Sequence, residues 1–128
     1  MCQETKDEHN LAVVYISYGE VYYQTKDYEK ALEFTNKATD LVKNFHFTYE
    51  YLQLLLVKAH ISLGIHSEHI LNICQEAIQL AEKTKLYNKK KDFHMVLAKY
   101  YDRCGNKEHF LRETENLFRV ERLLQGEE

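Results

Sequence analysis

The sequence predicts an all-α protein of about six helices arranged as three antiparallel pairs. Proline is absent and only 4 glycines occur among the 128 residues, so few positions interrupt a helix. Apolar residues recur at intervals of three and four along most of the chain, which is the helical period. The hydrophobic content of 45% and charged content of 29% are typical of a folded globular chain and exclude a disordered one.

A frayed or partly helical lead is expected over 1–8, followed by one domain over 9–125. The first predicted helix, at about 9–25, carries apolar residues at helical spacing: Leu11, Val14, Tyr15, Tyr18 and Tyr22. The second, at about 28–44, has Asp27 as its expected N-cap. The third, at about 48–63, is rich in leucine, and Gly64 is expected to end it in a left-handed conformation.

The fourth predicted helix, at about 67–85, has a buried stripe of Ile70, Leu71, Ile73, Ala77, Ile78 and Ala81. The fifth, at about 88–103, turns Phe93, Leu97, Ala98 and Tyr101 inward. Gly105-Asn106 forms the next turn, and the sixth helix, at about 107–124, carries Phe110, Leu111, Leu117, Phe118 and Leu124. The pairs therefore form units at about 9–45, 48–85 and 88–124.

The stretch from Tyr15 to Leu41 combines small, aromatic and turn residues in one pattern. Gly19 precedes Ala31 by twelve residues and Ala38 follows by seven more, so small side chains would let two helices approach closely. This stretch resembles a tetratricopeptide repeat, which implies an α-α superhelix. The spacing between turns departs from the usual ~34 residues: 64 − 26 = 38 and 105 − 64 = 41. Phe110 also replaces the small residue of the first unit.

A second resemblance lies in 83–128. Leu86-Tyr87, Asp92-Phe93, the run 98–101, Gly105-Asn106 and the run 122–126 occur in the order and spacing of one family. The region resembles the C-terminal end of Rap-type response-regulator aspartate phosphatases. The first eighty residues resemble that family's repeat domain only in their tetratricopeptide pattern.

That resemblance implies a repeat domain that binds a short signalling peptide. In the family, an N-terminal three-helix bundle grips a response regulator or a DNA-binding regulator and, in phosphatases, supplies a catalytic glutamine. This chain has no room for the bundle, so the resemblance implies a fragment or a short relative without a catalytic residue of its own. The implied partners are a signalling peptide and, through the missing bundle, a response regulator.

Composition excludes several other classes of function. The formal charge of 17 − 20 = −3 argues against direct nucleic-acid binding. Three cysteines without CxxC spacing, no signal peptide and no apolar run of ~20 residues predict a cytoplasmic protein with reduced thiols and no membrane contact. Cys74 is expected to be partly exposed.

A stacked helical array has a concave face lined by the first helix of each pair. Positions left over after the packing residues are assigned predict a peptide-binding groove, made of Glu20, Tyr23, Gln24, Tyr51, Lys58, Ser62, Met95, Lys99, Asp102 and Arg103. Val13, Ile16, Leu54 and Asp92 fall on the same expected face. Lys58, Lys99 and Arg103 could receive a carboxylate, and Glu20 an amino terminus or a basic side chain.

No metal, cofactor or catalytic site is predicted. His66 and His69 lack a third ligand at fixed spacing, and His60 and His94 are expected to be buried and hydrogen-bonded. The lysines over 83–91 surround a loop and are expected to be solvated.

Three functions remain open from the sequence. The chain is a peptide-sensing domain of the Rap type, a general tetratricopeptide adaptor or oligomerisation module, or the effector domain of a peptide-regulated transcription factor. Helix 9–25 also presents Leu11, Val14 and Tyr18, which a preceding repeat would cover. We therefore expect a homodimer through this helix.

Overall fold

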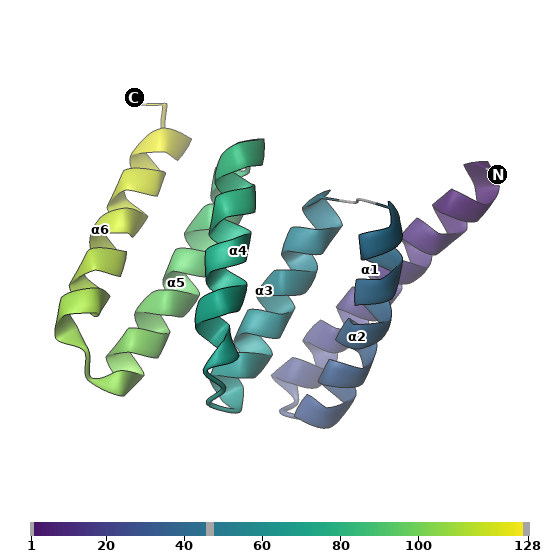
Figure 1. Ribbon diagram of the computed structural model, residues 1–128, viewed down its shortest axis with the longest axis horizontal. Helices are drawn as coiled ribbons and strands as arrows, with labels where there is room; N and C mark the ends of the chain where they lie inside the picture. The colour runs from purple at the N-terminus through teal and green to yellow at the C-terminus, as the bar shows by residue number, and fades with distance from the viewer. Residues whose placement is uncertain (1, 46–47, 127–128) are drawn as a thin grey trace. The chain divides into compact units, whose positions relative to one another are not determined.

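The computed structural model describes residues 2–45 and 48–126, with the backbone alone for 2–7 and 43–45. In these ranges it contains six α-helices and no strand (Figure 1). The helices are α1 (Cys2–Gln24), α2 (Tyr28–Phe45), α3 (Thr48–Gly64), α4 (His69–Thr84), α5 (Tyr87–Cys104) and α6 (Lys107–Leu124). The predicted all-α fold of sequential antiparallel pairs is confirmed.

Most predicted helix boundaries lie within two residues of the observed ones. The exception is α1, which begins at Cys2 and so includes most of the expected lead over 1–8. Residues 2–8 contain neither glycine nor proline, so nothing in the sequence stops the helix there. The N-cap of α2 is confirmed, because the Asp27 Oδ1 accepts a hydrogen bond from the Lys30 amide at 3.3 Å.

The two glycines expected to end helices behave differently. Gly105 has φ 72° and closes α5 in the left-handed conformation, which confirms the turn predicted at Gly105-Asn106. Gly64 was wrongly assigned, because it is the last residue of α3 and His66 takes the left-handed conformation with φ 58°. Gly64 instead makes room for a neighbour: a Cβ at this position would lie 2.6 Å from the Tyr28 Oη. The end of the Tyr28 side chain, and not a left-handed turn, accounts for the glycine here.

The helices group into two compact units, 1–66 and 67–128. In the first unit α1 packs against α2, and α3 contacts both. Gly19 faces Thr35, whose Cγ2 would lie 2.8 Å from a Cβ on the glycine, and Ala31 and Ala38 are fully buried. The close approach predicted from small residues is therefore present. The core of this unit comprises Ala12, Ile16, Ala31, Ala38, Val42, Leu54, Val57 and Ile61.

In the second unit α5 packs against both α4 and α6. Phe93 is fully buried, and His94 is buried and joined through its Nδ1 to the Glu113 Oε2 at 2.6 Å. The predicted burial and hydrogen bonding of His94 are confirmed. The buried stripe of α4 is Ile70, Cys74, Ala77 and Ala81.

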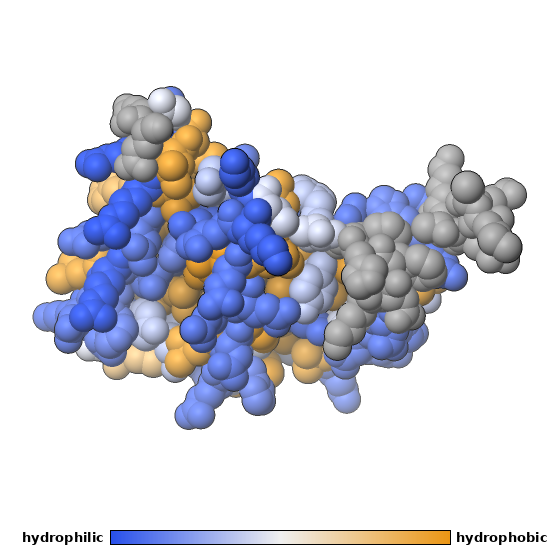
Figure 2. Space-filling view, turned by 45° about the horizontal axis from the view of Figure 1, so that its top comes forward, coloured by the Kyte–Doolittle hydropathy of each residue, from blue (hydrophilic) through white to orange (hydrophobic). Residues whose placement is uncertain are grey.

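The apolar residues noted in the sequence of α6 are not all buried. Leu111 and Phe118 are 61% and 63% exposed, whereas Val120 is buried. Hydrophobic surface is visible over α6, at the left edge of Figure 2, between hydrophilic side chains. Among the described helices of its unit, α6 packs only against α5. A helix with one neighbour buries one stripe, so its remaining apolar residues stay exposed.

Candidate functional site

A groove of about 300 Å³ lies between α1 and α3 within the first unit. It is lined by Val13, Ile16, Ser17, Glu20, Tyr49, Glu50 and Gln53. Ile16, Ser17 and Glu20 lie three, four and seven residues after Val13, so the helical period places the four on one face. The three α3 residues come from that helix's first two turns, opposite this face.

Two carboxylates stand on opposite walls of the groove. The Glu20 Oε1 accepts a hydrogen bond from the Gln53 Nε2 at 2.7 Å, so the two helices are joined across it. The Glu50 Oε1 lies 2.6 Å from the His9 Nε2, with 21% of the Glu50 side chain exposed. Among the described side chains, the lining contains no lysine or arginine. A carboxylate accepts up to about four hydrogen bonds, so both retain capacity for a donor from a ligand.

The aliphatic part of the groove comes from α1. Val13 is 41% exposed, while Ile16 is 4% exposed and forms part of the floor. An apolar floor between two acidic walls suits a short stretch of chain that carries an aliphatic group beside a positive charge. Figure 1 shows how α1 and α3 run beside one another in this unit.

The predicted groove residues of the first unit are only partly brought together. Glu20 lines the groove and Gln24 is exposed on α1. Tyr23 is half-buried and its ring stacks on that of His60, with centroids 5.2 Å apart. Tyr51 and Lys58 are half-buried, and Tyr51 packs against the core.

Three positions expected to be exposed are buried. Ile16, Leu54 and Ser62 have exposed fractions of 4%, 0% and 7%. For the two α3 positions the error has a physical reason: the buried residues of α3 lie on several sides of the helix, so its periodicity defines no single exposed face. Ser62 is therefore unavailable to a ligand in this structure. Ile16 lies on α1 and is part of the core of the unit.

The predicted residues of the second unit lie together on α5. Met95, Lys99 and Asp102 are spaced four and three apart, and all are exposed. Arg103 is exposed in the last turn, and Asp92 is half-buried in the second. These residues share one helix face, and their role in a ligand site stays a prediction.

Sequence reasoning missed Ser17, Tyr49, Glu50 and Gln53. A signal was present, because Glu50 and Gln53 are polar residues in the first two turns of a helix that is mostly apolar after them. Polar residues at such positions mark the side of α3 that meets solvent. The prediction instead placed this side at Tyr51 and Lys58.

Cys74 is not a partly exposed thiol, as expected from the sequence, but is fully buried. Burial, with a smaller contribution from the charge of Glu113, raises the pKa of Cys74 to about 12. The thiol therefore stays protonated near neutral pH and is not a nucleophile. Within the described ranges, no group of three His, Cys, Asp or Glu side chains could hold a metal ion.

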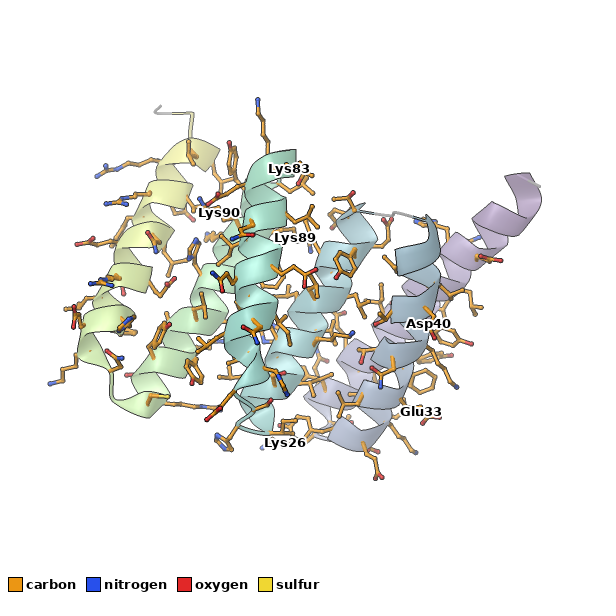
Figure 3. The ribbon with its side chains drawn as sticks, in the orientation of Figure 1. Lys26, Glu33, Asp40, Lys83, Lys89 and Lys90 are labelled. Carbon is orange, nitrogen blue, oxygen red and sulfur yellow. The ribbon has the colours of Figure 1, made fainter. Side chains whose placement is uncertain are left out.

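The basic cluster is held more closely than a solvated loop. Figure 3 shows Lys83 at the end of α4 and Lys89 and Lys90 at the start of α5. Lys89 is buried, and the Lys90 Nζ lies 3.0 Å from the Glu82 Oε1. Lys91 pairs with Glu121 on α6. Part of the positive charge is thus neutralised within the unit.

No protein-family model, curated protein or solved structure matches the chain. None of the helices in the described part of the chain combines the length and apolar character that crossing a lipid bilayer requires. Assignment of a function therefore rests on the groove and on the sequence patterns.

Proposed function

We propose that this chain is a helical repeat domain that binds a short segment of peptide or protein in the groove between α1 and α3. The observation that carries the proposal is the combination of Val13 and Ile16 with Glu20 and Glu50 in one groove. The ligand is an extended segment with a basic side chain or an amino terminus beside an aliphatic residue. Charge-assisted hydrogen bonds to the carboxylates fix its orientation, and the apolar floor holds its neighbour.

In its finer form, the proposal is a tetratricopeptide-repeat domain of the Rap type, acting in the cytoplasm as the sensing part of a peptide-regulated protein. The close approach at Gly19 and the buried Ala31 and Ala38 support the repeat pattern of the helix pair over 9–45. The order of motifs over 83–128 supports the Rap-type likeness. On this proposal the regulated partner, a response regulator, is gripped by a bundle outside this chain, and the chain itself catalyses nothing.

A general adaptor role is the second candidate. The exposed apolar residues of α1, described below, favour it, because exposed apolar stripes often bind other helices. The two candidates differ in their ligand: a sensor takes a short free peptide, whereas an adaptor takes a helix or tail of a folded partner.

The groove is tested by isothermal titration calorimetry. The probes are the five- to seven-residue product of a neighbouring small gene and an acetylated Leu-Arg-Leu peptide with its Leu-norleucine-Leu analogue. We expect the Arg peptide to bind and the norleucine analogue to bind about 10-fold or more weakly, because a charge-assisted hydrogen bond contributes ~1.5–3 kcal/mol. Added salt should weaken the Arg peptide's binding.

Matched variants locate the site. Glu20→Gln and Glu50→Gln keep the side-chain shape and remove the charge, so each should weaken binding of the Arg peptide. Glu33→Gln is the control, because Glu33 lies on α2 outside the groove and pairs with Lys37 at 3.7 Å (Figure 3). Equal affinity for both tripeptides, or equal effects of all three variants, would refute the site. No heat signal with the gene product would count against the sensing role.

A further inference from the structure

An apolar stripe runs along α1 on a side that is largely exposed, although Tyr18 contacts Phe34 of α2. Leu11, Val14, Tyr18 and Val21 are 41%, 43%, 48% and 52% exposed. Their spacing is three, four and three, which is the repeat of a helix–helix seam in a coiled coil. Four exposed apolar residues in this register are unusual for a helix that faces only water.

None of the four stripe residues belongs to the core or lines the groove. Successive residues are ~100° apart around a helix, so Val14 and Val21 lie far from Gly19, which faces α2, while Leu11 and Tyr18 lie ~80° and ~100° from it. Tyr18 also belongs to a cluster of aromatic rings. In this cluster the Phe34 ring of α2 lies 5.1 to 5.9 Å, between centroids, from the rings of Tyr15, Tyr18 and Tyr22. The stripe and this cluster form one continuous apolar and aromatic face.

We propose that a second copy of this chain covers the stripe, with the two α1 helices antiparallel about a two-fold axis near Ile16. The register is self-complementary: Leu11 of one copy falls opposite Val21 of the other, and Val14 opposite Tyr18. In a two-fold interface every contact occurs twice, so the interface contains two Leu11–Val21 contacts and two Val14–Tyr18 contacts. The proposal is independent of the ligand in the groove.

The charges beside the stripe favour this occupant. Asn10, Ser17 and Gln24 flank it on one edge and Tyr15 and Tyr22 on the other, so the flanking residues of α1 carry no charge. Lys37 of α2 lies over the Tyr15 ring, with its Nζ 5.8 Å from the centroid, and is paired with Glu33 at 3.7 Å. At the end of the seam, Glu8 of one copy falls opposite Tyr22 of the other. Lys30 lies over that ring, with its Nζ 5.4 Å from the centroid. Opposite charges therefore meet at both ends of the antiparallel pair.

The outer face of α6 is the competing surface. Leu111 and Phe118 are more exposed than any residue of the stripe, but they are only two. Glu115 lies between them on the same face, and Arg122 continues it. Burying that face would remove both charges from water, which is costly unless each finds a partner. The α1 stripe carries no such charge.

Sedimentation equilibrium of the whole chain over a range of concentrations tests the proposal. We expect a monomer–dimer equilibrium, and Val14→Lys should raise the dissociation constant by about 100-fold or more, because two unpaired charges would be buried. Asn36→Lys, on an exposed α2 position away from the stripe, and Phe118→Lys are the controls and should leave the constant unchanged. Far-UV circular dichroism checks that each variant is folded.

Crosslinking gives a second readout. In a Cys2→Ser, Cys104→Ser background, Ser17→Cys places one thiol on each side of the two-fold axis, and a short bismaleimide should join the copies. Asn36→Cys should give no crosslinked dimer. A wild-type monomer at every concentration, a dimer dissociated by Phe118→Lys but not by Val14→Lys, or a 1:1 complex only with another protein's helix would overturn the proposal.

Discussion

Gly19 of α1 contacts Thr35 of α2. We therefore predict that the side chain at position 35 decides whether Gly19→Ala raises or lowers the free energy of unfolding. A Cβ on Gly19 would lie 2.8 Å from the Thr35 Cγ2, well inside the ~3.5–4.0 Å of ordinary carbon contacts. Thr35 is fully buried, and its Oγ1 donates a hydrogen bond to the Leu32 carbonyl at 3.1 Å. The methyl group therefore cannot rotate away without loss of that bond.

Two opposing terms determine the effect of Gly19→Ala. Overpacking of a core lowers the free energy of unfolding by ~1–3 kcal/mol, whereas alanine in place of glycine inside a helix raises it by ~1 kcal/mol. We expect a net loss of up to ~2 kcal/mol in the free energy of unfolding. Thr35→Ser removes the methyl group and keeps the hydroxyl. The next atom is then the Val57 Cγ1 at 3.5 Å, an ordinary contact. In this background Gly19→Ala should stabilise the protein by up to ~1 kcal/mol.

Urea denaturation of the four proteins of this double-mutant cycle measures the difference. Each protein is followed by far-UV circular dichroism, and the slopes of the transitions show whether two-state analysis holds. The expected coupling between Gly19 and Thr35 is ~1–3 kcal/mol. If Gly19→Ala changes the free energy of unfolding equally in both backgrounds, the close approach of α1 and α2 does not explain the glycine.

Two further predictions concern other buried contacts. Gly64→Ala should destabilise the protein by ~1–2 kcal/mol, because its Cβ would lie 2.6 Å from the Tyr28 Oη. Thermal denaturation should show that this loss of stability is reversed in a Tyr28→Leu background. If the loss remains in that background, the contact with Tyr28 is not its cause. Cys74, whose pKa is raised to about 12, should resist a thiol reagent in the folded Cys2→Ser protein at neutral pH and react only in urea. Cys104 is exposed and should react at once; rapid modification of both thiols in the folded protein would refute the burial of Cys74.

The fold was largely predictable because local signals agreed with one another. The absence of proline, the helical periodicity and the turn residues Asp27 and Gly105 all indicate the same helix boundaries, and the structure confirms them. The error at Gly64 is of another kind. A glycine needed for a left-handed turn and a glycine needed for a close approach look alike in a sequence, and only the position of Tyr28 distinguishes them.

The candidate site was less predictable, because the helices that form it lack a distinct polar face. Even in α4, which lies outside the site and buries a single stripe, the sequence analysis placed Cys74 outside that stripe. In α3 the buried residues Leu52, Leu54 and Leu56 point in different directions. The helical period alone could not therefore identify which polar residues meet α1. The joining of Glu20 and Gln53, 33 residues apart, depends on tertiary packing.

The composition of α1 connects the groove and the proposed copy interface. Ala12 and Ile16 are buried, Val13 opens into the groove, and Val14 and Val21 stand on the uncovered side. A helix that packs on its neighbours along only part of its circumference needs one apolar stripe to fold, and the remaining valines add nothing to that packing. Val13 and Val14 are ~100° apart, so one face can hold a ligand while the other meets a second copy. The excess of apolar surface over what folding requires is therefore the physical reason to assign α1 two binding faces.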